Sequence, residues 1–113
     1  MPNYVRAFQP GGTFFLTLVT DRRAPIFADE SARTMLHAAM DRCRQLHPFA
    51  LDAMVLLPDH LHILMTLPDD DAGFSMRLRN IKSGFIHAYL ASGGTEQRRS
   101  TSRIRQRIRG VWQ

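Results

Sequence analysis

The sequence has one cysteine, one lysine and no long apolar run. Cys43 cannot form an internal disulfide, and no apolar stretch is long enough to cross a bilayer. Residues 1–12 lack the basic start, apolar middle and small-residue cleavage site of a secretory signal. These absences favour a reducing, cytoplasmic setting and predict no membrane partner.

The positive charge comes almost entirely from arginine. Fourteen of the 15 basic residues are arginine, the formal net charge is +5 and the pI is about 10.6. A guanidinium group donates two parallel hydrogen bonds to a phosphate, and small basic domains often bind nucleic acid or an anionic membrane surface. A genome rich in G and C also produces arginine in place of lysine, so composition leaves both explanations open.

Turn signals divide the 113 residues into a few elements within one domain, 1–113. The apolar pattern predicts strands at 13–20, 49–57 and 60–67, a helix at 31–46, a second helix after the acidic loop 68–75 and a fourth strand within 103–112. The strand at 49–57 is apolar at nearly every position, which predicts a central place in the sheet. This order is that of a ferredoxin-like α+β sandwich, an antiparallel sheet with both helices on one face.

The segment PDHLHILM (58–65) places two histidines in an apolar strand. Alternate side chains of a strand share a face, so His60 and His62 lie together, opposite the apolar side chains that pack under the helices. Two imidazoles about 6–7 Å apart, twice the strand rise, can bind one divalent metal ion.

The histidine pair alone is a weak indication of metal. A polar pair on a half-exposed strand is the common alternative, and a metal site needs a third ligand. Asp52 on the neighbouring strand is a candidate, whereas Asp59 points to the opposite face if the strand has already begun at that residue. The other histidines lie on or near helices and are expected to be structural or exposed to solvent.

Four blocks of the sequence resemble the REP-associated tyrosine transposases, relatives of the HUH-type single-tyrosine transposases. The opening block is NYVRAFQPGGTFFLTLVT, and the most specific block is VLLPDHLHILMTLPDDDAGFSMRLRNIKSGF, with its His-hydrophobic-His pair, TLP end and acidic loop. The helix at 31–46 and the closing GVWQ stand where the family has a helix and a tryptophan-containing segment. Together the blocks cover nearly the whole chain.

The resemblance implies a role for the two histidines. His60 and His62 match the HUH pair, which binds Mg²⁺ or Mn²⁺ and polarises a phosphate of single-stranded hairpin DNA. In the family a tyrosine then attacks this phosphate and becomes joined to the 5′ end. The implied partner is single-stranded or hairpin DNA of the repetitive extragenic palindrome type, and the implied location is the nucleoid in the cytoplasm.

The family's catalytic tyrosine has no counterpart in this sequence. It lies on a helix after the tryptophan-containing segment, which has only begun at Gln113, so the resemblance implies a domain that is incomplete at its C-terminal end. Tyr89 is in phase with Phe85 on the apolar face of its helix and is expected in the core. No catalytic residue is therefore assigned.

Cations near the second helix and in the arginine-rich end are candidates for DNA contact. They are Arg77, Arg79, Lys82, Arg103 and Arg105. The first three surround the start of a helix that lies near DNA in the family, and the arginines of the end could follow a phosphate backbone. The alternatives are ordinary solvent-facing charge on the helix and a flexible, solvated connector at the end.

Three functions remain open at this point. The leading one is the core of an HUH-type transposase, which acts on hairpin DNA by metal-assisted transesterification. A non-catalytic DNA-binding remnant, such as a repressor, would bind DNA without a covalent adduct. An unrelated metal-dependent hydrolase of the same fold would turn over a soluble substrate and ignore DNA.

A shortened fourth strand predicts association between chains. An exposed sheet edge presents backbone donors and acceptors that a second chain can satisfy. We therefore expect a homodimer or an exchange of strands, measured as the mass of the particle in solution. A monomer alone at high protein concentration would contradict this expectation.

Overall fold

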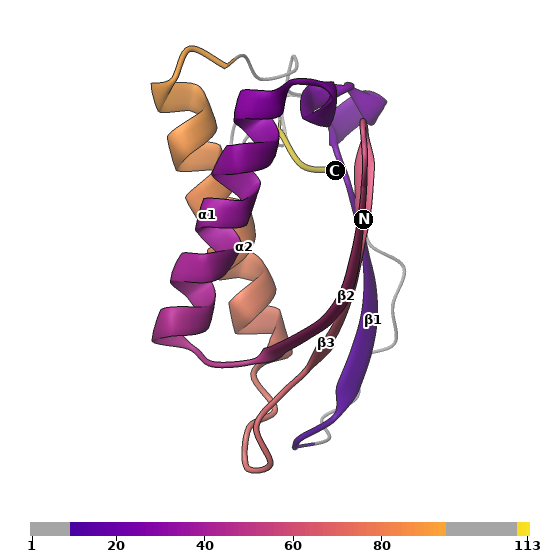
Figure 1. The fold of residues 1–113 in the computed structure, drawn as a ribbon, viewed down its shortest axis with the longest axis vertical. Helices are drawn as coiled ribbons and strands as arrows, with labels where there is room; N and C mark the ends of the chain where they lie inside the picture. Colours follow the sequence, from indigo (N-terminus) through magenta and orange to yellow (C-terminus); the bar gives the residue numbers. More distant parts are fainter. Residues whose placement is uncertain (1–9, 95–110) are drawn as a thin grey trace, which may run out of the picture.

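The computed structural model describes residues 10–94 and 111–113. Its main elements are β1 (Thr13–Val19), α1 (Glu30–Leu46), β2 (Ala50–Leu57), β3 (His60–Thr66) and α2 (Phe74–Ala91), with two short 3-10 turns, η1 (Asp21–Arg23) and η2 (Ile26–Ala28), between β1 and α1. Both helices lie side by side on one face of an antiparallel sheet of order β1-β3-β2 (Figure 1). This arrangement confirms the ferredoxin-like α+β sandwich. Neither helix of the described ranges is long and apolar enough to span a membrane.

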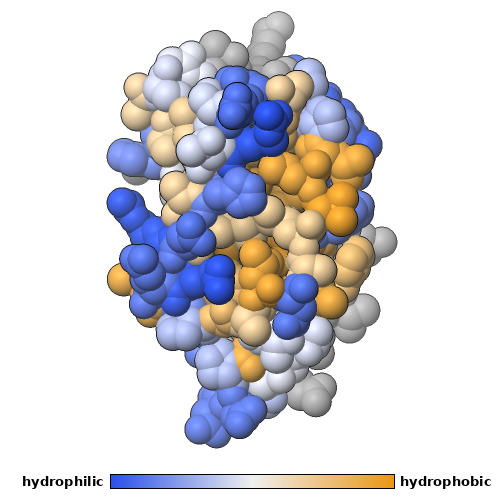
Figure 2. All heavy atoms as spheres, in the orientation of Figure 1, coloured by the Kyte–Doolittle hydropathy of each residue, from blue (hydrophilic) through white to orange (hydrophobic). Residues whose placement is uncertain are grey.

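The central strand is β3, so the prediction that the strand at 49–57 is central was wrong. β3 pairs with β1 along one side and with β2 along the other, which leaves β2 at an edge. β2 is nevertheless apolar on both faces: Val55 is 56% exposed on the open face, and Met54 and Leu56 are only partly buried on the helix side. In Figure 2 apolar side chains gather on the side of the molecule where the sheet lies. A short apolar run therefore does not by itself identify a central strand.

The alternation predicted for β3 is confirmed. Leu61, Ile63 and Met65 are completely buried beneath the helices. The side chains between them, those of His60, His62, Leu64 and Thr66, are all half-buried on the opposite face. β3 therefore divides the sheet into a core face and an open face.

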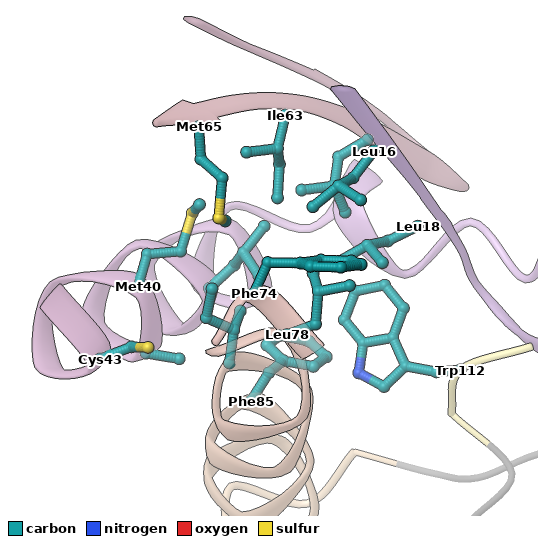
Figure 3. Packing of buried hydrophobic residues seen from close by; sticks show 14 of the residues in the cluster. Leu16, Leu18, Met40, Cys43, Ile63, Met65, Phe74, Leu78, Phe85 and Trp112 are labelled. Carbon is teal, nitrogen blue, oxygen red and sulfur yellow. The ribbon is translucent and has the colours of Figure 1, made fainter. Parts of the chain in front are cut away.

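The core fills the space between the sheet and the helices (Figure 3). In Figure 3 the side chains of the two strands point toward the helices; they are Leu16 and Leu18 of β1 and Ile63 and Met65 of β3. The helices contribute Met40 and Cys43 of α1 and Phe74, Leu78 and Phe85 of α2. The two helices approach closely at Gly84, where an added Cβ would lie 3.4 Å from the Cβ of Ala39. Burial raises the pKa of the Cys43 thiol, which suits a side chain that serves as apolar packing.

The last described residues pair with the end of β1. Trp112 forms an antiparallel bridge with Thr20, and the Gln113 N–H donates to the Val19 carbonyl at 2.9 Å. The indole of Trp112 is 4% exposed and lies against the rings of Phe27 and Phe85, with centroids 5.7 and 5.6 Å away. The chain end thus closes one end of the core. Most of the predicted fourth strand lies outside the described residues.

A buried arginine joins the start of α2 to the end of α1. Arg77 is 1% exposed, and its guanidinium donates two hydrogen bonds to the Asp71 carboxylate (3.0 and 2.8 Å) and one each to the carbonyl oxygens of His47, Pro48 and Gly73 (3.0, 2.8 and 3.0 Å). All five N–H donors of the side chain are therefore used inside the protein. The prediction that Arg77 contacts DNA is corrected, because a buried and fully bonded guanidinium has no donor left for a phosphate.

The Arg77–Asp71 pair makes stability sensitive to acid. Hydrogen bonds from Arg77, and then from the Gly73 N–H, lower the pKa of Asp71 from 3.8 to about 2. Because the folded pKa lies below the unfolded value, the contribution of the pair is present above about pH 4 and is lost as the pH falls through about 2. Between these values we expect the Tm of the wild type to fall more steeply than that of Asp71→Asn. Asp70→Asn, at the exposed neighbouring position, is the matched control and should behave like the wild type; equal slopes for all three would contradict the role of the pair.

Candidate metal centre

The two histidines of β3 lie next to each other on the open face of the sheet. Their ring centroids are 5.0 Å apart, and the ring planes meet at 80°. In the register of the sheet, His62 stands between Thr17 of β1 and Val55 of β2. The shared face was predicted from the sequence and is confirmed, whereas metal binding by the pair stays a prediction.

His60 is bonded to the residue that precedes it. The Asp59 Oδ1 atom lies 2.7 Å from the His60 Nδ1 atom, and the Arg23 Nε–H donates to Asp59 Oδ2 at 2.9 Å. The hydrogen bond with His60, and then that with Arg23, lower the pKa of Asp59. An ionised carboxylate only accepts, so the His60 Nδ1 atom carries the proton. β3 begins at His60, so Asp59 belongs to the turn, and the condition under which it would point to the opposite face is not met.

His62 is held by two residues of β1. The Thr17 hydroxyl lies 2.9 Å from the His62 Nδ1 atom. On the same face, the ring of Phe15 stacks on the imidazole with centroids 5.6 Å apart and planes 16° apart. Phe15 is 62% exposed, so its ring belongs to the open face and not to the core. The two histidines therefore both use Nδ1 for protein contacts.

The histidine pair fits part of a metal site. Among the described residues no hydrogen bond reaches the Nε2 atom of either ring, so these nitrogens are the ones that could bind an ion. No third histidine, cysteine or carboxylate of the described residues joins the pair in a group that could hold a metal. Asp52 in particular accepts a hydrogen bond from the Thr66 hydroxyl, at the far end of β3 from the pair. An octahedral ion such as Mg²⁺ would take its other ligands from water and substrate oxygens.

Known proteins of one kind resemble the chain over most or all of its length. No family model matches it. The chain is 38% identical over 89 residues to the REP-associated tyrosine transposase of Escherichia coli K12, a match that covers 78% of the chain and 53% of that protein. It is 31% identical over 115 residues to a Haemophilus influenzae protein named "Putative REP-associated tyrosine transposase", which covers 100% of the chain and 62% of that protein. The chain thus spans somewhat more than half the length of these curated relatives.

A solved structure decides the family. A REP-associated tyrosine transposase bound to a REP hairpin has a TM-score of 0.69 and 33% identity, and the match covers 96% of this chain and 68% of that one. The chain belongs to the REP-associated tyrosine transposases. A Deinococcus radiodurans protein solved as a putative transposase, with a TM-score of 0.61 over 80% of this chain and 68% of its own, is only 17% identical and supports the fold alone.

The candidate DNA contacts that the structure describes do not lie at the histidines. Arg79 is exposed and Lys82 is half-buried on α2, which covers the face of the sheet opposite His60 and His62. Arg103 and Arg105 lie outside the described residues. The structure therefore offers two separate regions, an open sheet face with imidazoles and a helix with an exposed guanidinium.

Sequence reasoning missed the residues around the histidines. Thr17 and Phe15 are brought to His62 by the pairing of β1 with β3, and Arg23 reaches Asp59 from a turn 36 positions earlier in the chain. No short-range sequence pattern predicts these three contacts. The contact of Asp59 with His60 could have been predicted, because a two-residue turn before His60 leaves the Asp59 side chain free to fold back on the first residue of the strand.

Proposed function

We propose that this chain binds single-stranded or hairpin DNA of the repetitive extragenic palindrome type in the cytoplasm, at the nucleoid. His60 and His62 would hold Mg²⁺ or Mn²⁺ against one phosphate of that DNA. The observation that supports this proposal is the pair of adjacent imidazoles with uncommitted Nε2 atoms, in a chain 33% identical to a transposase bound to a REP hairpin. Residues 1–113 would then form a single HUH domain.

The open face of the sheet suits this role. A divalent ion bound there would withdraw charge from a phosphate and favour attack at phosphorus. His60 and His62 would bind through Nε2, while Asp59 and Thr17 keep the rings in place. Phe15, exposed beside His62, lies where a nucleotide next to that phosphate would pass.

The covalent step is assigned to no residue of the described ranges. Tyr89 is their only tyrosine, and it is partly buried with its ring stacked on Phe85 at 5.3 Å, as predicted for a core residue. The family reaction needs a tyrosine oxygen that attacks phosphorus, forms a 5′-phosphotyrosine and releases a 3′ hydroxyl. The packed position of Tyr89 favours a second candidate function, a DNA-binding domain that holds a hairpin without cutting it.

A gel experiment separates these functions. We expect an end-labelled REP-type hairpin with Mn²⁺ to shift on a native gel with the wild type, and His60→Ala/His62→Ala to weaken that shift because the metal bridge to the phosphate is lost. On a denaturing gel we expect neither an adduct nor a cut strand. An adduct would show that a nucleophile lies within these residues, whereas the absence of any shift would exclude the DNA-binding proposal. Turnover of a soluble phosphoester without DNA binding would instead support the hydrolase.

Arg79 should contribute to DNA binding through charge alone. Each phosphate contact releases counterions, so Arg79→Gln should reduce the slope of log affinity against log salt by about 1 and leave sequence preference unchanged. Arg44→Gln is the matched control, since this exposed arginine already lies 3.8 Å from the Asp41 carboxylate. Affinity measured by fluorescence anisotropy over a salt series tests this. An equal slope for both variants would exclude a phosphate contact by Arg79.

A further inference from the structure

Both imidazoles are bonded through the same ring nitrogen. His60 Nδ1 lies 2.7 Å from Asp59 Oδ1, and His62 Nδ1 lies 2.9 Å from the Thr17 hydroxyl. A neutral imidazole has one N–H, and a free imidazole can place it on either nitrogen. A partner that accepts from Nδ1 leaves the lone pair on Nε2, where a metal ion can bind. An ionised Asp59 can only accept, whereas the Thr17 hydroxyl can donate or accept and has this effect when it accepts.

Asp59 is held from both its backbone and its side chain. The Thr20 N–H donates to the Asp59 carbonyl at 3.0 Å, and the fully buried Thr20 hydroxyl lies 3.0 Å from the same oxygen. The side chain is held by the Arg23 Nε–H at 2.9 Å. Every one of these contacts comes from η1 or the residue before it. The carboxylate therefore cannot turn away from His60 without breaking the bond to Arg23.

The turn that carries Arg23 has an uncommon backbone. Arg22 and Arg23 have φ angles of 54° and 56°, in the left-handed region that residues other than glycine rarely adopt. Such conformations persist where the surrounding structure holds them, and they are frequent near functional sites. Here the conformation brings the guanidinium of Arg23, which is 58% exposed, onto the carboxylate of Asp59.

We propose that Asp59, Arg23 and Thr17 are positioning residues that keep the Nδ1–H tautomer of both histidines, so that two Nε2 lone pairs are presented to one divalent cation. Asp59 acts on His60, Arg23 acts through Asp59, and Thr17 acts on His62. Asp59 is assigned a positioning role and not that of a metal ligand, because among the described residues no group of three histidine, cysteine or carboxylate side chains could hold an ion. This inference rests on the proposed metal-binding function of the pair.

The first test reads the tautomers without metal. ¹⁵N NMR of the histidine-labelled chain, at an alkaline pH where imidazoles are neutral, distinguishes protonated from unprotonated ring nitrogens. We expect Nδ1–H on both rings of the wild type. Asp59→Ala should move the proton of His60 to Nε2, Arg23→Gln should do so in part, and Thr17→Val should move the proton of His62.

Two substitutions on the same sheet face are matched controls. Asp52→Asn changes a carboxylate bonded to Thr66, and Thr13→Val removes a hydroxyl that lies 2.8 Å from that of Thr66. Both should leave the two imidazoles unchanged. Arg23→Gln guards against a folding defect, because it changes an exposed side chain that touches neither ring.

The second test measures the affinity for Mn²⁺ alone, by the relaxation of water protons. Loss of a partner that orients a ligating histidine costs about 10–100-fold in metal affinity, and we expect this for Asp59→Ala and Thr17→Val but not for the controls. Unchanged tautomers, or an unchanged affinity in variants of a wild type that binds Mn²⁺, would overturn the positioning role. If the wild type did not bind Mn²⁺ but the tautomers shifted as expected, the proposed metal function would fail. The role of Asp59, Arg23 and Thr17 in setting the tautomers would stand.

Discussion

The register of β3 between β1 and β2 decides which side chains enter the core and which face the open side. Leu61, Ile63 and Met65 fill the space under the helices because the odd positions face inward. A slip of one residue would exchange the two faces, bury His60 and His62 among apolar side chains and expose the leucine between them. The same apolar contacts that stabilise the sandwich thus place the imidazoles, so the core and the candidate metal centre have one structural cause.

Arg77 shows how burial changes the meaning of a charge. On the sequence it is one of three cations around the start of a helix, and nothing local separates it from Arg79. In the structure it satisfies carbonyl groups of the α1–β2 connection and pairs with Asp71, while Arg79 is exposed on the same helix. A charge buried with all its donors used supports the fold, and only the exposed charge is available to an outside partner.

Periodic patterns in the sequence predicted the features that depend on neighbouring residues. They did not predict the features that depend on which distant segments pair. The shared face of His60 and His62 follows from alternation within one strand, and the helix bounds follow from apolar spacing and breakers. The edge position of β2 depends on which strands pair, and an apolar run carries no information about that. Phe15 shows the same limit: alternation requires that either Phe14 or Phe15 face outward, but which of them does so is set by pairing with β3.

The geometry of the candidate centre depends on the first part of the described chain as much as on the histidines. Thr17 and Phe15 reach His62 only while β1 is paired with β3, and Arg23 reaches Asp59 only from the turn that follows β1. The same turn is bonded to Val111, whose carbonyl accepts a hydrogen bond from the Asp21 N–H at 2.8 Å. Because an ion that binds only the arranged site stabilises the arrangement, metal binding at the pair would strengthen the pairing of β1 with β3 and the docking of the chain end together.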